Sequence, residues 1–200
     1  MANNSALLTC RNYALRPQVS DRNSSSLHLD FTAQINDRKV CLMRLDFQFV
    51  ALPIENFSHL FSLNDAELES HGARRVNVDS HPGYPCRVSL MDASVSERVI
   101  LTPFRHHDVI SPYQSAGPIF IRENAKTAKP HVNEIPSMFH HRLLSVRAYD
   151  EAALMKNAKV VEGRVLEETI RDFFTKESIS YLQIHNAGPG CFNCTVRRAG

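Results

Sequence analysis

The residues near the end of the chain place a cysteine and a histidine where they could share chemistry. Two alternating segments, 179–185 and 191–197, are joined by the turn-forming residues Asn186-Ala187-Gly188-Pro189-Gly190. A hairpin closed by this turn makes His185 and Cys191 neighbours across the strands, with Cβ atoms about 4.5–5.5 Å apart. A thiol beside an imidazole is the minimum arrangement for an activated thiolate.

The hydrophobic pattern decides between two registers of this hairpin. With His185 opposite Cys191, one face of the hairpin stays wholly apolar, because Ile184 then lies opposite Phe192. A register shifted by one residue places Ile184 opposite Asn193 and mixes apolar and polar side chains along the ladder. We therefore expect His185 and Cys191 to be directly opposed.

The cysteine–histidine pair supports two interpretations. In the first, the protein is an enzyme in which Cys191 is the nucleophile and His185 is its base. Asn186 or Asp150 would then orient the imidazole, and Arg147 would hold an anionic substrate. In the second, the two residues pack under another layer of the protein and their role is structural.

A second group of residues could bind an anion without catalysis. Arg147 and Tyr149 are two residues apart, so they point to the same side of the alternating segment 141–149. A guanidinium offers a planar fork that fits a carboxylate or a phosphate. A structural ion pair between Arg147 and an acid such as Asp150 explains the same pattern equally well. The predicted anion-binding residues are Arg87, His106, Tyr113, Arg147 and Tyr149.

The sequence carries no recognisable signature of a metal or a cofactor. Cys191 and Cys194 are three residues apart and point to opposite faces of a strand, so we expect Cys194 in the core. A metal site would need four scattered ligands to meet, namely Cys86, His106, His185 and Cys191. The Gly-rich phosphate loop, the His-Glu-x-x-His motif and the Gly-x-Ser-x-Gly motif are missing. We therefore predict neither a bound metal nor a cofactor.

Strands must position most of these residues. Alternation predicts strands near 27–32, 41–49, 74–79, 86–91, 97–103, 117–122, 141–149, 179–185 and 191–197. Asn64 with Glu67 three residues later predicts a capped helix over 65–71, and an apolar stripe predicts a second helix over 164–176. Many strands without a regular βαβ order indicate an α+β fold with a mostly antiparallel sheet and two or three short helices.

The chain is predicted to form a single domain behind an arm. A length of 200 residues suits one domain with a sizeable core. Residues 1–26 show no hydrophobic period and contain a polar, turn-rich stretch, so they are predicted to be a flexible N-terminal arm. The α+β domain then spans residues 27–200.

Composition excludes several classes of protein. The 23 Lys and Arg residues and the 21 Asp and Glu residues leave a net charge of +2, which argues against a nucleic-acid partner. No apolar run approaches the roughly 20 residues that cross a membrane, and the N-terminus lacks the pattern of a signal peptide. The five cysteines are an odd number in a chain too long for a disulfide scaffold, so reduced thiols and a cytoplasmic location are expected. The sequence predicts no particular oligomeric state.

Four phrases together resemble a bacterial family that is known only as a domain of unknown function. They are HPGYPCRVSL at 81–90, SPYQSAGPIF at 111–120, VRAYD at 146–150 and HNAGPGCF at 185–192. The resemblance runs from about Phe47 to Arg198 and implies no activity. It implies only which positions belong to the family pattern: Cys86, Arg87, His106, Ser111, Tyr113, Gly117, Arg147, Tyr149, Asp150, His185, Asn186 and Cys191.

The sequence as a whole favours a non-catalytic domain that binds a small anionic ligand. The alternative is an enzyme with a thiol–imidazole site at Cys191 and His185 that acts on a small anionic substrate. Convergence of the cysteine–histidine pair with Cys86, His106 and Arg147 on one cleft would favour the enzyme.

Overall fold

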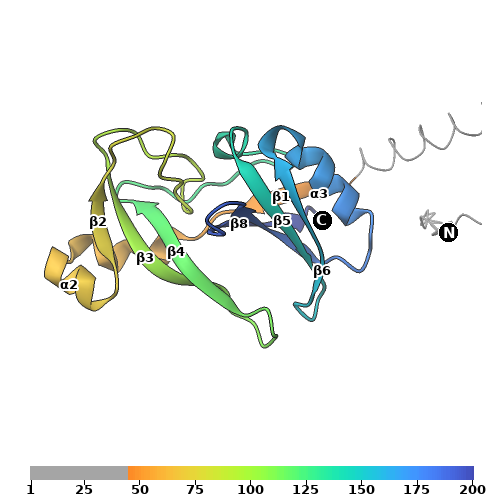
Figure 1. Ribbon diagram of the computed structural model, residues 1–200, viewed down its shortest axis with the longest axis horizontal. Helices are drawn as coiled ribbons and strands as arrows, with labels where there is room; N and C mark the ends of the chain where they lie inside the picture. Colours follow the sequence, from red (N-terminus) through yellow and green to blue (C-terminus); the bar gives the residue numbers. More distant parts are fainter. Residues whose placement is uncertain (1–44) are drawn as a thin grey trace, which may run out of the picture. The chain divides into compact units, whose positions relative to one another are not determined.

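The computed structural model describes residues 45–200, which form two β-sheets and two α-helices (Figure 1). The five-stranded sheet contains, in spatial order, β1 (Phe47–Val50), β8 (Phe192–Arg198), β7 (Tyr181–Asn186), β5 (Leu143–Tyr149) and β6 (Met155–Glu162). The three-stranded sheet contains β2 (Arg74–Asn77), β3 (Arg98–His107) and β4 (Ser115–Arg122). The α-helices are α2 (Asp65–Ser70) and α3 (Leu166–Phe174). The 3₁₀ turns are η1 (Ile54–Asn56), η2 (Ser58–Ser62), η3 (Ser137–Phe139) and η4 (Gly163–Val165).

All neighbouring strands in both sheets are antiparallel, so the predicted α+β class is confirmed, but the strands form two sheets where the sequence predicted one. The predicted arm over 1–26, the strand near 27–32 and the first part of the strand near 41–49 lie outside the described residues. Neither helix of residues 45–200 is long and apolar enough to span a membrane.

One face of the five-stranded sheet packs against α3. On β5, Leu144, Val146 and Ala148 are fully buried, whereas Ser145 and Arg147 alternate with them and face the other side. Helix α3 covers the buried face with the apolar stripe that its sequence predicts, namely Leu166, Ile170, Phe173 and Phe174. Each side chain of this size stabilises the fold by about 1.5–3 kcal/mol when it leaves water. The opposite, polar face of the sheet is therefore left to carry the candidate site.

The three-stranded sheet has a core of its own. Ile100, Ile119 and Ile121 are fully buried and pack together with Leu68 of α2. Helix α2 begins as predicted, because the Asn64 side chain accepts the N–H of Glu67 at 3.0 Å and the Glu67 carboxylate accepts the N–H of Asn64 at 2.8 Å.

Two segments differ from the prediction. Residues 86–91 do not form a strand: Cys86 makes only an isolated bridge to Phe120, and Leu90 has a positive φ of 50°. Their alternation reflects a buried loop in which Cys86, Val88 and Leu90 all point into the protein. Strand β6 was not predicted, because Val161 is its one buried residue and the other side chains show no apolar period.

The C-terminal hairpin does not have the predicted register. His185 lies opposite Phe192, and Asn186 donates its N–H to the Cys191 carbonyl at 2.9 Å. The prediction that His185 and Cys191 are directly opposed is therefore wrong.

A β-bulge explains the difference. In the regular part of the hairpin, Ile184 pairs with Cys194 and Leu182 pairs with Val196, so the apolar face is intact. The register then shifts at the next rung and leaves Asn193 as an extra residue on β8. Because a shift of two residues preserves the apolar face, the hydrophobic pattern could not distinguish the two arrangements.

Candidate functional site

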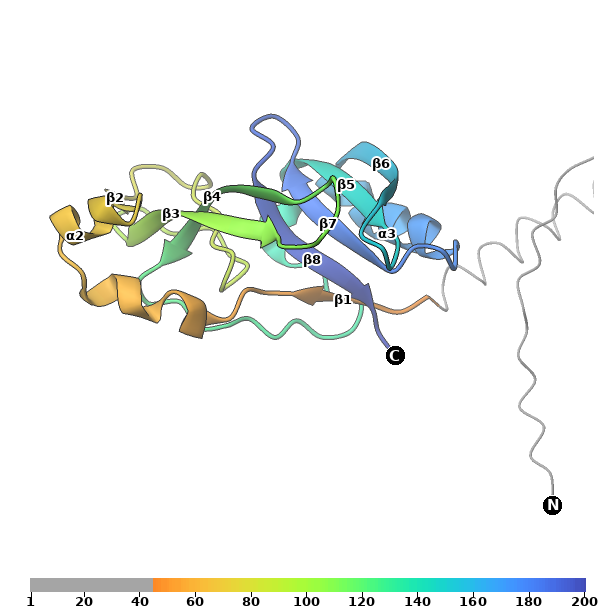
Figure 2. The same ribbon diagram turned by 90° about the horizontal axis from the view of Figure 1, so that it is seen from below.

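The long β3–β4 hairpin extends from the three-stranded sheet onto the polar face of the five-stranded sheet (Figure 2). His107 Nδ1 donates to the Tyr113 carbonyl at 2.7 Å, and its Nε2 hydrogen-bonds to the Tyr181 hydroxyl, also at 2.7 Å. Gln183 donates from its amide to the His106 carbonyl at 3.2 Å. These hydrogen bonds fix the hairpin over β7 and hold Tyr113 and His106 against the polar face.

Arg147 lies on this face in β5, between β7 and β6. Its cross-strand neighbours are Gln183 on β7 and Ala158 on β6. The guanidinium Nε donates to the Ser145 hydroxyl at 3.4 Å, and the side chain also hydrogen-bonds to Tyr149. Arg147 is half-buried, so its charge is close to solvent but is held by a rigid strand.

Arg147 forms no ion pair with any Asp or Glu among residues 45–200. Asp150, the acid that the sequence offered as a structural partner, pairs with Lys156 at 3.5 Å instead. Most other arginines of similar exposure have carboxylate partners: Arg75 with Glu123, Arg122 with Glu97, Arg142 with Asp92, and Arg171 with Glu167. Arg198 instead donates to the carbonyls of Lys176 and Ile179. The positive charge of Arg147 is therefore available to an anion.

Tyr149, which hydrogen-bonds to Arg147, belongs to a cluster of tyrosine rings. Tyr149 stacks on Tyr181 with ring centroids 5.3 Å apart, and Tyr113 meets Tyr149 edge-on at 6.1 Å. Burial raises the pKa of the Tyr149 phenol, and the charge of Arg147 and a hydrogen bond from its side chain partly oppose that rise. The Tyr149 hydroxyl is thus protonated at neutral pH and can donate a hydrogen bond.

His106 adds a polar but uncharged group. Its ring stacks on Phe192 at 4.9 Å and meets His185 edge-on at 5.1 Å. Its Nδ1 is buried without a hydrogen-bond partner in the described part of the chain. Desolvation, together with the nearby charges of His107 and Arg147, lowers the His106 pKa to about 4, so the ring is neutral at pH 7.

Arg87 does not belong to this accessible group. Its side chain is only 1% exposed, its Nε donates to the Phe192 carbonyl at 2.7 Å, and another guanidinium N–H donates to the Pro85 carbonyl. Burial lowers its pKa to about 10, an effect that the nearby Cys191 and Cys86 thiols oppose. A guanidinium enclosed in this way holds the loop after Pro85 against β8 and cannot meet an anion from solvent.

The thiol–imidazole contact of the enzyme interpretation is not formed. His185 is fully buried, with Nδ1 2.9 Å from the Gly190 carbonyl oxygen and Nε2 3.3 Å from Gln183 Oε1. Burial lowers its pKa to about 3. Cys191 is partly exposed, and its thiol points to the Pro189 carbonyl at 3.9 Å rather than to the imidazole.

The two predicted orienting residues serve local turns instead. Asn186 Oδ1 accepts from the Asn193 amide at 2.9 Å. Asp150 Oδ1 accepts from the Leu154 N–H at 2.9 Å and so shapes the turn between β5 and β6. Both side chains are engaged away from His185.

The cysteines of residues 45–200 are free thiols. Cys194 lies in the core, as predicted, and Cys86 is equally buried. Within the described residues, no three His, Cys, Asp or Glu side chains lie close enough together to hold a metal ion. The four ligands of the metal-site interpretation therefore do not converge.

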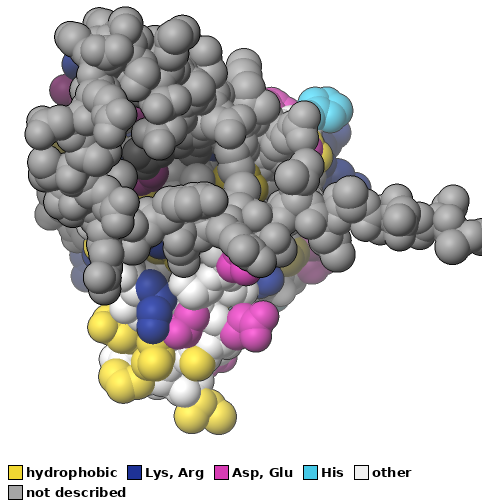
Figure 3. Space-filling view, turned by 90° about the vertical axis from the view of Figure 1, so that its right-hand side faces the viewer, with side chains coloured by type: hydrophobic (Ala, Val, Ile, Leu, Met, Phe, Trp, Pro, Cys, Tyr) yellow, Lys and Arg dark blue, Asp and Glu magenta, His cyan; other side chains and the backbone are white. Residues whose placement is uncertain are grey.

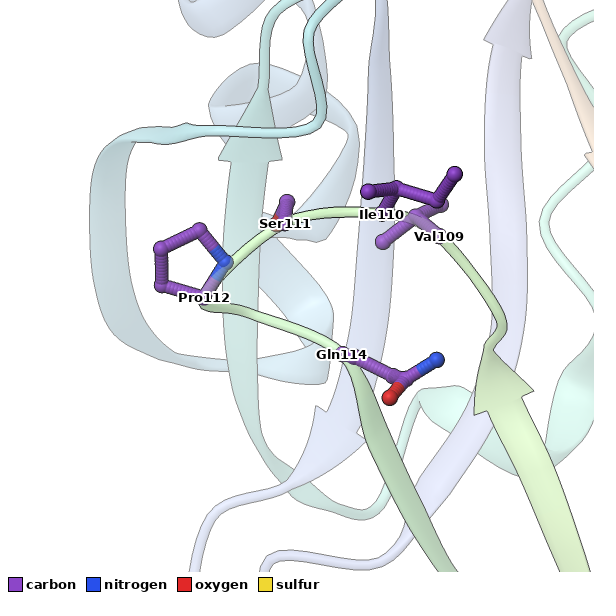
Figure 4. Close-up of a pocket in the computed structure, with 5 residues that line it drawn as sticks. All are labelled: Val109, Ile110, Ser111, Pro112 and Gln114. Carbon is purple, nitrogen blue, oxygen red and sulfur yellow. The ribbon is translucent and has the colours of Figure 1, made fainter.

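Two surface depressions lie away from Arg147. The first, of about 570 Å³, is formed by the β3–β4 loop, and Figure 4 shows its lining side chains spread around that loop rather than aimed at one point. These residues are Val109, Ile110, Ser111, Pro112 and Gln114. The second, of about 610 Å³, lies where the β5–β6 turn meets the segment before β7. Neither contains a predicted ligand-binding residue.

The chain matches the family described as "Protein of unknown function (DUF1203)" over residues 83–198, which is more than half of its length. It belongs to the DUF1203 family. The match begins at Gly83, so it is shorter than the resemblance that was expected from about Phe47. Neither a curated protein nor a solved structure matches the chain.

The DUF1203 region contains both parts of the site, because it includes the β3–β4 hairpin as well as β5, β7 and β8. The sequence predicted Arg147, Tyr149, Tyr113 and His106, and the structure places these four residues around one face. The sequence pattern did not identify His107, Gln183 and Tyr181, whose hydrogen bonds hold the β3–β4 hairpin on that face. Gln183 and Tyr181 lie two and four residues before His185, so all three share one face of a strand. This shared face was the one signal in the sequence that could have identified them.

Proposed function

We propose that this DUF1203 protein binds a small anion at Arg147 and does not catalyse a reaction there. The observation that carries the proposal is a half-buried guanidinium that has hydroxyl partners but no carboxylate partner among residues 45–200. Partly desolvated charges in proteins are usually paired, so an unpaired one on a rigid strand is a natural ligand anchor.

Neighbouring groups support binding of an anion. The Tyr149 and Ser145 hydroxyls can donate hydrogen bonds beside the guanidinium, and no Asp or Glu among residues 45–200 pairs with it. A binding role is favoured over catalysis because the thiol–imidazole contact is not formed and the nearest imidazoles are held neutral by burial.

Two-dimensional NMR of the full-length chain tests this proposal. Acetate and inorganic phosphate are each titrated at pH 7, and the Nε–Hε resonance of Arg147 is followed. A saturable shift is expected for at least one anion, and the shift should weaken as the ionic strength rises, because the site is partly solvated. A response that never saturates would contradict the proposal.

A pair of matched variants assigns the site. Arg147→Gln should abolish the saturable response. Lys159→Gln should leave it unchanged, because Lys159 pairs with Val146 and so lies on the opposite face of the same two strands. Equal losses in both variants would indicate nonspecific attraction of the anion.

We also infer a cytoplasmic location. The support is that Cys86, Cys191 and Cys194 are all free thiols, and cytosolic conditions keep thiols reduced. Recovery of a disulfide-linked form from freshly lysed cells, trapped with an alkylating reagent, would argue against this location.

A further inference from the structure

An apolar part of the same sheet face lies uncovered beside Arg147. Ala158 pairs with Arg147 and Val160 pairs with Ser145, so these side chains share one face across β5 and β6. Leu143 belongs to the same face, because it lies two residues before Ser145 on β5. Val160 is 59% exposed and Leu143 is 55% exposed. We term Leu143, Ala158 and Val160 the apolar strip.

The apolar strip is a distinct surface rather than a scatter of single side chains. The β3–β4 hairpin is fixed over β7 by the His107–Tyr181 and Gln183–His106 hydrogen bonds, and so leaves β6 open. Exposed apolar residues are common, but here they adjoin each other and a cation that has no carboxylate partner in the described part of the chain.

We propose that the anion bound at Arg147 is the carboxylate of a small free acid whose apolar tail lies on the apolar strip. This inference rests on the proposed function and names the chemical class of its ligand. The carboxylate receives the guanidinium N–H groups of Arg147, and the tail covers Ala158 and Val160.

Charge favours a singly charged ligand. Arg147 supplies one positive charge, and His106 is neutral at pH 7, so a doubly charged phosphate would be only half neutralised. The planar guanidinium fork matches the two oxygens of a carboxylate.

The dimensions of the sheet limit the length of the tail. Diagonal neighbours on adjacent strands are about 7–8 Å apart, which is the separation expected between Arg147 and Val160. Leu143 lies four residues from Arg147 along β5, a distance of about 13 Å. An acid of roughly six carbons therefore matches in length the 7–8 Å diagonal from the position of Arg147 to that of Val160.

A carboxylate marks the far end of the apolar strip. Glu162 pairs with Leu143 across the ladder, and its side chain binds Arg164 at 2.6 Å. A ligand with a second carboxylate at the end of its tail would place that charge against the apolar side chain of Val160, and Arg164 is already paired with Glu162. The surface thus selects a monocarboxylate over a dicarboxylate of the same length.

A chain-length series tests the inference. Acetate, butyrate, hexanoate and the dicarboxylate adipate are titrated against the full-length chain, with the Arg147 Nε–Hε resonance as the readout. We expect the affinity to rise about twofold per added methylene. Complete burial of a methylene would raise the affinity roughly fourfold, but one side of the tail stays in water, so about half of that free energy is gained. Adipate should bind several-fold more weakly than hexanoate.

Variants locate the tail. Val160→Thr keeps the shape of the side chain and should bring hexanoate close to acetate in affinity, with acetate itself unchanged. Val95→Thr is the matched control, because Val95 is similarly exposed, at 54%, but lies outside the five-stranded sheet. Arg147→Lys keeps the charge without the fork and should weaken every acid in the series.

The outcomes separate this inference from the proposed function. Saturable binding of acetate with no gain for hexanoate would overturn the apolar tail and leave anion binding intact. A hydrophobic tripeptide that binds through its C-terminal carboxylate more tightly than hexanoate would replace the free acid as the ligand. A stable dimer in sedimentation equilibrium that Val160→Thr dissociates would assign the apolar strip to a second copy of the chain.

Discussion

Burial keeps two histidines uncharged at neutral pH. Desolvation lowers the pKa of His185 to about 3 and that of His106 to about 4, whereas a histidine in the unfolded chain titrates near 6.5. Between these values the unfolded chain binds protons that the folded chain does not. The two neutral rings therefore leave the free energy of unfolding undiminished above about pH 6.5. Below that pH their effect lowers it progressively as the pH falls towards 3.

We predict a measurable effect of pH on folding stability. At pH 5, His185 alone should lower the free energy of unfolding by about 2 kcal/mol relative to pH 7. Urea denaturation of the wild type and of His185→Gln at both pH values measures this difference. The variant should lose about 2 kcal/mol less between pH 7 and pH 5, whatever its stability at pH 7.

His59→Gln is the control for this pH dependence. His59 is exposed in η2, so its replacement should leave the difference between the two pH values unchanged. An unchanged difference in His185→Gln as well would show that the ring does not remain neutral in the folded protein.

Strand parity predicted which side chains share a face, and local contacts decided what they do. Arg147 and Tyr149 were predicted to lie together because residues two apart in a strand must do so. Arg87 was predicted in the same group, but it is buried in a loop, and parity gives no information on loops. His107 rather than His106 binds Tyr181, because the strand is irregular between Phe104 and His107.

At the scale of whole elements, the sequence was informative where a pattern is local. The Asn64–Glu67 capping box and the stripe of α3 depend on residues within a turn or two, and both are confirmed. The register of the C-terminal hairpin was wrong because a bulge at Asn193 leaves no mark in the alternation. Strand β6 was missed because an exposed edge strand needs no apolar period.

Gly163 sets how closely β6 and η4 approach the turn at Phe139. A Cβ at this position would lie 1.8 Å from the Phe139 carbonyl oxygen and 2.9 Å from His140 Cα, so the backbone itself would have to move. We predict that Gly163→Ala lowers the free energy of unfolding by about 3 kcal/mol, the upper end for overpacking. Urea denaturation measures the change.

Gly188→Ala is the matched control for this element. Nothing lies within 4 Å of a Cβ at Gly188, which sits in the exposed turn before β8. Its effect should stay within about 0.5 kcal/mol. Similar stabilities for the two variants would mean that the junction of β6 and η4 can relax.

At the scale of residues 45–200, side-chain links join two sheets with separate cores. Figure 1 shows the three-stranded sheet with α2 at one end and the five-stranded sheet with α3 at the other. Arg87 reaches the Phe192 carbonyl of β8, and His107 binds Tyr181 of β7. Asp92 pairs with Arg142 just before β5.

The hairpin that carries Tyr113 ends in an uncovered tip. Figure 3 shows hydrophobic side chains gathered at the lower end of the molecule, where Figure 1 places the β3–β4 loop. Ile110 is fully exposed in that loop, and the Ser111 hydroxyl donates to the Ala153 carbonyl at 2.9 Å. The tip therefore contacts the β5–β6 turn through a hydrogen bond rather than through the exposed Ile110. The position of the hairpin must then be fixed by the hydrogen bonds closer to the sheets.

Arg87 is the link whose loss should separate the two sheets. Its backbone N–H donates to the Phe120 carbonyl of β4 at 3.2 Å, while its side chain holds β8, so one residue bridges both sheets. Arg87→Met replaces the arginine with an apolar side chain of similar length. The Phe192 and Pro85 carbonyls then lose their donor. An unsatisfied buried acceptor costs about 1–3 kcal/mol, whereas removal of the buried charge relieves its desolvation cost. We therefore predict that Arg87→Met lowers the free energy of unfolding by about 2 kcal/mol.

Native-state hydrogen exchange shows where that stability is lost. In the wild type, amides of β3 and β7 should exchange through openings of similar free energy, whereas in Arg87→Met those of β3 should open at lower free energy than those of β7. Arg98→Met serves as the control, because Arg98 is an exposed arginine of β3 that pairs with Glu123 within the smaller sheet. If Arg87→Met lowers the protection of β3 and β7 by equal amounts, the two sheets unfold as one cooperative unit and the bridge is not what couples them.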